Sequence, residues 1–478
     1  KYEYICPAWY QRSITIPQNW QNKRIKLYLE RPHWETIVWL DKTYIGCQNS
    51  LSVPHIYDLG QVAPGDHLIT IRVDNTVKIA VGDAGAKGGD MNLAHSITDH
   101  TQTNWNGIVG KIELQAIDPV WIIDVQIYPD IKNSRAEVAL KLGNATGNAI
   151  AGHLHLKALS ENTLQTRSCP DLLVPFKTET EDTVIEVNYP MDGYVCWDEF
   201  APTLYTLAVN LEATGQLGTY CDMLKIRFGM REFKALGRRL TLNDRAVFLR
   251  GTLECCIFPL TGYPPTDIDS WRRIMGIAKA HGLNHLRFHS YCPPEAAFEA
   301  ADEMGFMLQV EGPFWAEFGV DKVLDEFAYI EADRILDTYG NHPSFCLMAL
   351  SNEPTGLSRE TFLAKVLSHW KRKDDRRLYT SGAGWPVLVE NDYLCTPKPR
   401  AHQWGHGLKS RFNSQPFSSN VDYTSFVSQY NVPIVSHEIG EWSSYSDYHQ
   451  IDKYNGVLKA YNLEHFRESL KAHGAKPV

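Results

Sequence analysis

The stretch 345–354 constrains the fold of this chain more than any other. It reads Phe-Cys-Leu-Met-Ala-Leu and then Ser-Asn-Glu-Pro. A continuous apolar run without polar alternation is typical of a strand that is buried on both faces, as in a parallel sheet. Pro354 has no backbone N–H for strand pairing, so the strand is expected to end before it. Where parallel strands alternate with helices, functional side chains lie at the C-terminal ends of the strands, and Asn352 and Glu353 hold such positions.

A second stretch, 433–438, has the same form and reads Pro-Ile-Val-Ser-His-Glu. It predicts a short apolar strand that ends on a carboxylate, Glu438. Two carboxylates on one rim of a barrel are what glycoside hydrolysis requires. Burial and mutual repulsion keep one acid of such a pair protonated, so that it can protonate the leaving oxygen, while the other stays ionised and attacks the anomeric carbon. In the retaining form of this reaction, the two carboxyl groups are about 5–5.5 Å apart.

The third region of the chain, residues 231–478, alternates strands with amphipathic helices, which predicts a (β/α)8 TIM barrel. Strands are predicted at 247–251, 283–289, 306–311, 345–350, 378–382, 400–404 and 432–437. Helices are predicted at 267–281, 294–304, 323–339, 358–373 and 457–473. The pattern contains seven strands and no eighth. Either the last strand is missing from the chain or another segment closes the barrel. We expect the strand to be missing, because an open parallel barrel would expose a hydrophobic edge.

The first half of the chain reads as two all-β domains. Residues 1–118 contain short strands rich in Ile, Val, Leu and Tyr, with turns such as 64–66, and predict a jelly-roll β-sandwich. Residues 119–230 repeat this pattern with the spacing and size of an immunoglobulin-like β-sandwich. The predicted fold is therefore multidomain, β and α/β, with the chemistry in the third domain.

Composition and charge exclude several classes of function. With 478 residues, of which 44% are hydrophobic and 22% charged, the chain is globular and has apolar material for several cores. Its net charge is −9 and it has no basic stripe, so we expect no nucleic-acid partner. No run of eighteen apolar residues is present, so we expect no membrane span. The ten cysteines follow no zinc spacing, and we expect neither a metal nor a cofactor.

The compartment and the oligomeric state are left open by the sequence. No signal peptide is visible at the start, which reads Lys-Tyr-Glu. Removal of a leader during processing would make the protein periplasmic or secreted, and a cytoplasmic location is the alternative.

Polar and aromatic side chains gather at the predicted strand ends of the third domain. The predicted catalytic pair is Glu353 and Glu438, and the candidates for contact with the substrate are Asn352, Arg287, His289, Glu254, Trp315, Trp385, Trp404, His437 and Trp442. Aromatic rings suit a sugar, because the C–H face of the sugar can pack on them. Arg287 has a structural alternative, since arginine often pairs with a strand-end carboxylate. His289 and His437 can likewise be buried supporting residues, and Glu311 ends another predicted strand.

Several motifs resemble those of glycoside hydrolase family 2, the family of β-galactosidases, β-glucuronidases and β-mannosidases. The most specific match is Asn-His-Pro-Ser at 341–344 followed by Asn352 and Glu353, which resembles the acid/base signature. The segment 433–440 resembles the nucleophile segment. Weaker matches cover the rest of the chain and lie at 105–112, 197–205, 228–231, 242–251 and 284–289.

The resemblance implies that Glu353 is the acid/base, that Glu438 is the nucleophile, and that Asn352 holds the 2-hydroxyl of the sugar. It also implies a jelly roll, an immunoglobulin-like sandwich and a barrel. Two departures from the family concern the identity of the sugar. Ile439 stands where the family has an aromatic residue, and the loop 254–265 lacks the Asn-His-Glu run of the family.

Two classes of function compete. The first is a retaining, exo-acting glycoside hydrolase, β-galactosidase-like, that removes one terminal sugar from an oligo- or polysaccharide. The second is a catalytically silent carbohydrate-binding protein on the same fold, which the pair of glutamates disfavours because binding needs no paired acids. A hydrolase of another bond, such as an amidase, would need a metal or a Ser or Cys nucleophile at a strand end, and none stands out.

Overall fold

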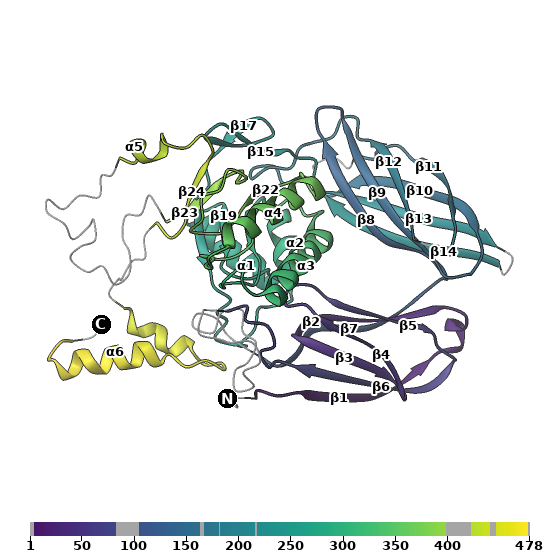
Figure 1. Ribbon diagram of the computed structural model, residues 1–478, viewed down its shortest axis with the longest axis horizontal. Helices are drawn as coiled ribbons and strands as arrows, with labels where there is room; N and C mark the ends of the chain where they lie inside the picture. Colours follow the sequence, from purple (N-terminus) through teal and green to yellow (C-terminus); the bar gives the residue numbers. More distant parts are fainter. Residues whose placement is uncertain are drawn as a thin grey trace.

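The computed structural model describes residues 4–82, 105–162, 167–180, 182–215, 218–397, 422–439 and 446–476. Two β-sandwiches precede a parallel sheet with helices packed around it, and both sandwiches lie against this helical part (Figure 1). The fold is multidomain and rich in β-structure. Within the described ranges, none of the helices combines the length and the apolar character that crossing a bilayer requires.

The first sandwich consists of two sheets with the strand orders β1–β6–β3–β4 and β5–β2–β7. Its strands are β1 (Ala8–Ile16), β2 (Arg24–His33), β3 (Glu35–Leu40), β4 (Thr43–Asn49), β5 (His55–Gln61), β6 (Gly65–Asp74) and β7 (Gly107–Ile117). Alternation sets the buried face of each strand, as in β3, where Thr36, Val38 and Leu40 are buried. Val38 and Leu40 pack with Ile25 and Leu27 of β2 in the core between the two sheets.

The second sandwich pairs the sheet β11–β10–β13–β14 with the sheet β12–β9–β8. Its strands are β8 (Val120–Asp130), β9 (Arg135–Asn144), β10 (Ile150–Ser160), β11 (Leu172–Thr178), β12 (Thr183–Pro190), β13 (Tyr205–Gly215) and β14 (Gly218–Phe228). Leu207 and Val209 of β13 share one buried core with Val138 and Leu140 of β9, so each sheet contributes its inner face.

A short hairpin sheet leads into the parallel strands. The hairpin strands are β15 (Phe233–Leu236), β16 (Arg239–Leu242) and β17 (Arg245–Val247). The parallel strands are β18 (Gly251–Glu254), β19 (His285–Phe288), β20 (Met307–Glu311), β21 (Phe345–Ala349), β22 (Leu378–Thr380), β23 (Leu394–Thr396) and β24 (Ile434–Ser436). Strands β18 to β22 pair in chain order, and so do β23 and β24. Parallel bridges from Ala383 to Asn352 and to Cys395 connect these two groups.

The helices of the third part alternate with these strands. They are α1 (Ile268–Ala280), α2 (Glu295–Met304), α3 (Lys322–Tyr339), α4 (Arg359–Lys373), α5 (Thr424–Val427) and α6 (Tyr461–Ala472). Local signals fix their ends. Asp267 caps α1 by accepting a hydrogen bond from the backbone N–H of Ser270, and Gly305 ends α2 with a φ of 65°.

Strand β21 is buried on both faces, as its apolar run predicts. Phe345 and Met348 belong to the core that the strands share with helices α2 and α3. Cys346 and Leu347 belong to a separate core, together with Tyr393. The predicted range of this strand is also confirmed to within one residue.

Two predicted strands need correction. The predicted first strand, 247–251, begins too early, because Val247 pairs with Leu240 inside the hairpin and the first parallel strand starts at Gly251. Short apolar alternation is the same in a hairpin strand and in a barrel strand, so the sequence does not separate them. The sixth parallel strand is β23, whereas the range predicted for it, 400–404, lies outside the described residues. In the ranges described here, no strand follows β24.

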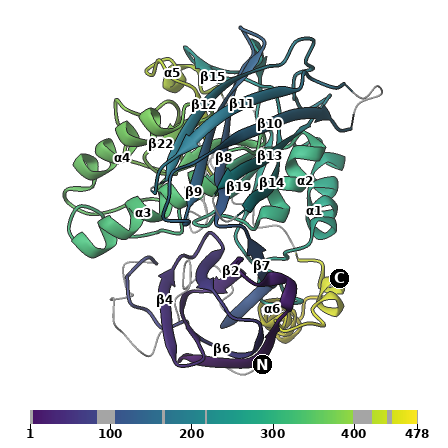
Figure 2. The same ribbon diagram turned by 90° about the vertical axis from the view of Figure 1, so that its right-hand side faces the viewer.

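Both sandwiches are fixed to the helical part by polar contacts. Glu331 on α3 accepts hydrogen bonds from Ser50 Oγ and from the backbone N–H of Leu51, both at 2.9 Å. Arg376 donates to the carbonyl of Ile127 on β8 at 3.1 Å. Figure 2 shows the first sandwich below the helical part and the second sandwich in front of it. The domains therefore meet through specific hydrogen bonds as well as apolar contact.

Candidate active site

Arg287, near the C-terminal end of β19, lies at the centre of a buried polar cluster. Its Nε donates to Glu311 Oε1 at 2.5 Å, and its Nη2 donates to Asn352 Oδ1 at 2.7 Å. Its Nη1 donates to Glu438 Oε1 at 3.1 Å. Burial lowers the pKa of Arg287, but the opposing interactions, of which that with the Glu311 carboxylate is the largest, together raise this pKa above its ordinary value. One side chain therefore links the ends of four different strands.

The register of the sheet explains why Arg287 points into this cluster. Arg287 lies opposite Leu253 of β18 and Gln309 of β20. Successive side chains of a strand point to opposite faces, so the next residue, Phe288, points toward the helices. There its ring lies 5.9 Å from that of Trp271 on α1, measured between ring centroids. The polar cluster therefore occupies the inner face of the sheet.

Glu311 is the fully buried counter-ion of this cluster. Besides the bonds from Arg287, its carboxylate accepts from the backbone N–H of Ser290 at 2.9 Å and from Gln309 Nε2 at 3.1 Å. A buried charge is stable only when it is paired and hydrogen-bonded, and both conditions hold here. Arg287 thus pairs with a strand-end carboxylate, as its structural alternative expects, and the same guanidinium also reaches Glu438.

Glu353 and Glu438 share an unusual backbone conformation. Their φ angles are 35° and 52°, in the left-handed region that residues with a Cβ rarely adopt. Such strained positions cluster at active sites, where they aim a side chain. Gly384 lies against Glu353, since a Cβ on this glycine would lie 2.8 Å from Glu353 Cγ. The glycine leaves the space that the glutamate side chain occupies.

His437 lies between the two glutamates. Its Nε2 is 3.3 Å from Glu438 Oε1 and 3.9 Å from Glu353 Oε1. Since both distances start from the same nitrogen, the two Oε1 atoms are at most 7.2 Å apart. The exposed fraction is 21% for the Glu353 side chain and 15% for that of Glu438, so both are reachable from solvent. The two ends of β21 and β24 thus bring the predicted pair together.

His289 is a second imidazole close to Glu438. Its Nε2 is 4.0 Å from Glu438 Oε1, and its ring meets that of Trp315 edge-on at 5.6 Å between centroids. Burial and the nearby charge of Arg287 lower the pKa of His289 to about 4, so the imidazole is neutral at neutral pH. The backbone N–H of Trp315 donates to the carbonyl of Val81 at 2.9 Å. A segment between β6 and β7 of the first sandwich therefore helps to position the wall of the site.

Among the predicted tryptophans, Trp385 lies next to the segment that carries Glu353. Trp385 is 38% exposed and donates from Nε1 to the carbonyl of Pro354, one residue beyond Glu353, at 3.0 Å. It therefore lies beside the candidate site with part of its ring open to solvent. Trp404 and Trp442 lie outside the described residues.

Glu254 has a different environment from the rest of the predicted set. It lies opposite Phe288 in the parallel register, and thus on the face of the sheet that is turned toward the helices. Its Oε1 accepts from the backbone N–H of Cys256 at 2.9 Å, and its Oε2 is buried without a hydrogen bond in the described structure. Burial raises the pKa of Glu254 to about 8. We therefore interpret Glu254 as a protonated carboxyl that accepts a backbone hydrogen bond within the turn after β18.

The cluster also contains residues that the sequence analysis did not single out. Gln309 accepts from Tyr393 Oη at 3.1 Å, and its Nε2 approaches Cys395 Sγ at 3.5 Å as well as Glu311. The sequence feature that could have indicated its role is a glutamine in the middle of an otherwise apolar strand. Its amide holds the Glu311 carboxylate in place beneath Arg287.

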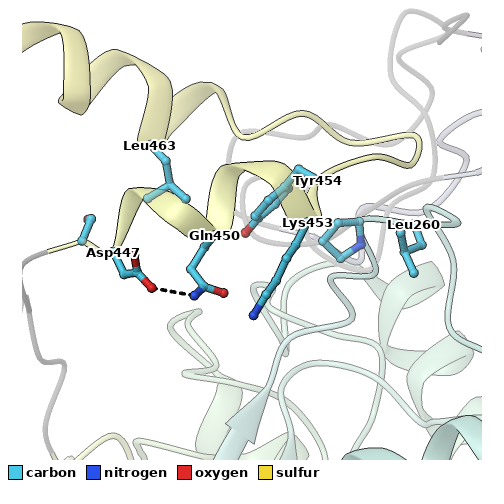
Figure 3. Close-up of a pocket in the computed structure, with 8 residues that line it drawn as sticks. Leu260, Asp447, Gln450, Lys453, Tyr454 and Leu463 are labelled. Carbon is cyan, nitrogen blue, oxygen red and sulfur yellow. Dashed lines mark hydrogen bonds between the residues drawn. The ribbon is translucent and has the colours of Figure 1, made fainter. Parts of the chain in front are cut away.

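A separate cavity of about 580 Å³ lies between the loop after β18 and the C-terminal segment (Figure 3). Its lining residues are Pro259, Leu260, Ser446, Asp447, Gln450, Lys453, Tyr454 and Leu463. None of them belongs to the Arg287 cluster, so this cavity is distinct from the candidate site.

Among the residues that the structure describes, no three His, Cys, Asp or Glu side chains are grouped to hold a metal ion.

Comparison with known proteins identifies the family of this site. The family model described as glycosyl hydrolases family 2 matches residues 120–231. The β-glucuronidase of Canis lupus familiaris is 19% identical over 503 aligned positions, which span 96% of this chain and 73% of the relative. These findings support glycosyl hydrolase family 2 as the family of this chain. The resemblance that the sequence motifs indicate is thereby confirmed, and the family consists of O-glycosyl hydrolases.

Other family 2 proteins match different shares of their own length. The β-galactosidase of Priestia megaterium is 20% identical, and the match spans 77% of this chain but 36% of the relative. Among solved structures, a family 2 β-galacturonidase from Eisenbergiella tayi bound to glycerol has a TM-score of 0.66 at 17% identity. The match covers 82% of this chain and 65% of that one.

A further solved relative is Bacteroides uniformis β-glucuronidase 2, covalently bound to cyclophellitol-6-carboxylate aziridine. It has a TM-score of 0.65 at 16% identity, and the match covers 79% of this chain and 46% of that one. At such identities the likeness is one of fold. The chain thus has the fold of family 2 and spans about half to two thirds of these solved proteins.

Proposed function

We propose that this chain is a retaining, exo-acting glycoside hydrolase that removes one terminal sugar from an oligo- or polysaccharide. The observation that carries the proposal is the approach of Glu353 and Glu438 to one nitrogen of His437. The resulting upper limit of 7.2 Å between their Oε1 atoms includes the separation of about 5–5.5 Å that retaining enzymes use. It leaves little of the range of about 6.5–9.5 Å that inverting enzymes need for a water molecule.

The proposed division of the chain follows the sequence analysis. Residues 1–118 form a jelly-roll domain, residues 119–230 an immunoglobulin-like sandwich, and residues 231–478 belong to a (β/α)8 barrel. Strands β18 to β24 are then seven of the eight barrel strands, and the acids end the fourth and the seventh. This arrangement supports a site at the C-terminal rim of the barrel.

In the proposed mechanism, Glu438 is the nucleophile and Glu353 is the acid/base. Glu438 has the guanidinium of Arg287 at 3.1 Å and His437 Nε2 at 3.3 Å, and both favour its ionised form. Its carboxylate attacks the anomeric carbon while Glu353 protonates the leaving oxygen, which gives a covalent glycosyl-enzyme. Glu353 then removes a proton from water, which attacks the same carbon and releases Glu438.

Asn352 is proposed to hold a hydroxyl of the sugar. Its Oδ1 accepts from Arg287 Nη2 at 2.7 Å, which fixes the orientation of the amide. The Nδ2 group is then turned away from Arg287 and is the donor available for a sugar hydroxyl next to the anomeric carbon. The rings of Trp315 and Trp385 are proposed as walls on which the sugar packs.

The names of the relatives favour removal of a single sugar unit and suggest which sugars to test. They divide among β-glucuronidases, β-galactosidases and a β-galacturonidase. The first experiment is therefore a panel of 4-nitrophenyl β-D-galactoside, β-D-glucuronide and β-D-galacturonide. Turnover of one of them supports the hydrolase. Binding of a sugar without turnover on any β-glycoside would instead support the catalytically silent carbohydrate-binding protein.

The decisive experiment separates the two acids. Glu438→Gln is expected to abolish covalent labelling by a 2-fluoro glycoside, since the nucleophile is gone. Glu353→Ala is expected to accumulate the glycosyl-enzyme from a dinitrophenyl glycoside, which needs no acid for departure, and azide is expected to restore its turnover. Hydrolysis by Glu438→Gln at the rate of the unaltered protein would refute the assignment of the nucleophile.

A further inference from the structure

The side chain of His437, the residue that follows β24, is fully buried. Its backbone N–H donates to the carbonyl of Thr396 on β23 at 2.9 Å, which continues the pairing of the two strands by one residue. The side chain has an exposed fraction of 0%. Val435, two residues earlier, lies opposite Cys395, whose sulfur approaches Gln309 in the Arg287 cluster, so alternation turns His437 to this inner face.

The surroundings of His437 Nε2 determine its protonation. In the described part of the chain, the oxygen atoms close to this nitrogen include Glu438 Oε1 at 3.3 Å, Asn352 Oδ1 at 3.4 Å and Glu353 Oε1 at 3.9 Å. The amide oxygen of Asn352 is an acceptor here, because it also receives the hydrogen bond from Arg287. The Asn352 amide oxygen and the Glu438 carboxylate oxygen are both acceptors, and a nitrogen beside them is stable when it carries a hydrogen, so Nε2 is a donor.

In the proposed reaction, a negative charge shifts between the carboxyl groups of Glu438 and Glu353, which both lie near this donor. Before the first step, Glu438 is ionised and Glu353 is protonated. When Glu438 forms its bond to the anomeric carbon and Glu353 gives its proton to the leaving oxygen, the charge on Glu438 disappears and Glu353 becomes the carboxylate. The second step reverses both changes. The pair therefore carries one negative charge throughout, and only its location changes.

We propose that His437 is a positioning residue whose Nε2–H stabilises this charge at both of its locations, first on Glu438 and then on Glu353. The inference rests on the proposed retaining mechanism. The shorter distance to Glu438 agrees with the resting state, in which Glu438 is the carboxylate.

Two other groups face Glu438 from β19. Arg287 Nη1 lies 3.1 Å and His289 Nε2 lies 4.0 Å from the same oxygen that His437 approaches. Both groups remain when His437 is replaced, so loss of His437 should lower the activity without abolishing it. A hydrogen bond to a charged group corresponds to a change of about 10- to 100-fold in a rate.

The first test needs no substrate. In ¹H–¹⁵N spectra of protein labelled with ¹⁵N-histidine, the His437 signal is identified by its loss in His437→Gln. We expect Nε2 to carry a proton at neutral pH and its resonance to move in Glu438→Gln, which removes the charge on the nearer partner. An unprotonated Nε2, or a resonance that does not respond to Glu438→Gln, would overturn the inference.

The second test measures the two half-reactions in a matched pair of variants. His437→Gln keeps an N–H donor near the position of Nε2, whereas His437→Leu removes it at similar volume. With the 4-nitrophenyl β-glycoside that the panel identifies, His437→Leu should lower kcat/KM by about 10- to 100-fold. Burst kinetics with the dinitrophenyl glycoside should show a similar loss in the release of the glycosyl-enzyme. His437→Gln should be about tenfold faster than His437→Leu in both steps.

The outcomes separate this inference from the proposed function. A loss confined to one half-reaction, or equal losses in both variants with equal unfolding temperatures, would leave His437 with a merely structural role. Absence of turnover on every β-glycoside in the panel would refute the proposed function. The spectra would in that case still decide whether Nε2 donates to Glu438.

Discussion

The pH dependence of stability provides a direct test of the environment of Glu254. Burial raises the pKa of this carboxyl from 4.5 to about 8 in the folded chain. The folded state therefore holds the proton more tightly than the unfolded state. The stability that this proton contributes is fully present below about pH 4.5, decreases above that value and is lost once the pH exceeds about 8.

The size of the effect follows from the two pKa values. At about 1.36 kcal/mol per pH unit, the full difference amounts to about 5 kcal/mol, of which about 4 kcal/mol is lost between about pH 5 and about pH 8.5. Glu254→Gln replaces the carboxylic acid by a neutral amide of the same shape and removes this dependence. The variant should therefore become more stable than the unaltered chain as the pH rises.

Thermal unfolding by calorimetry at several pH values is the assay, with Glu326→Gln as the control. Glu326 is exposed on α3, so its replacement removes the same charge from a solvated position. If Glu254→Gln and the unaltered chain lose stability in parallel up to about pH 8.5, the carboxyl is ionised in the folded state and the reasoning fails. A raised KM in Glu254→Gln without a change in this dependence would support the predicted contact with substrate instead.

Two further predictions concern the supports of the catalytic pair. Gly384→Ala would add a Cβ 2.8 Å from Glu353 Cγ, so we expect activity to fall by about 100-fold as the acid is displaced. Gly65→Ala has a similarly positive φ with no atom within 4 Å of its Cβ, and an equal loss of activity in this control would contradict the prediction. Glu311→Gln removes the charge that balances Arg287, and should lower the free energy of unfolding by about 3–5 kcal/mol in denaturant titrations. A change below about 1 kcal/mol would mean that Arg287 is balanced elsewhere.

The sequence by itself determined which strands end in the candidate acids. The apolar run before Asn352 and Glu353 predicts a buried strand because hydrophobic periodicity is a property of consecutive residues. The same holds for the strand that ends before Glu438. The composition, the alternation of strands with helices and the family motifs are likewise properties of the sequence alone, and they indicate a family 2 glycoside hydrolase.

The tertiary structure decided which of the candidates meet and which do not. Whether a strand residue points inward depends on its register against its neighbours, and this register turns Arg287 into the cluster and Glu254 toward the helices. The three-residue strand β23 exists only because its neighbours complete its hydrogen bonds. The distance between the two acids depends on left-handed φ angles at two separate strand ends, 85 positions apart in the sequence. Contacts of this range are fixed by packing, which no local pattern of residues encodes.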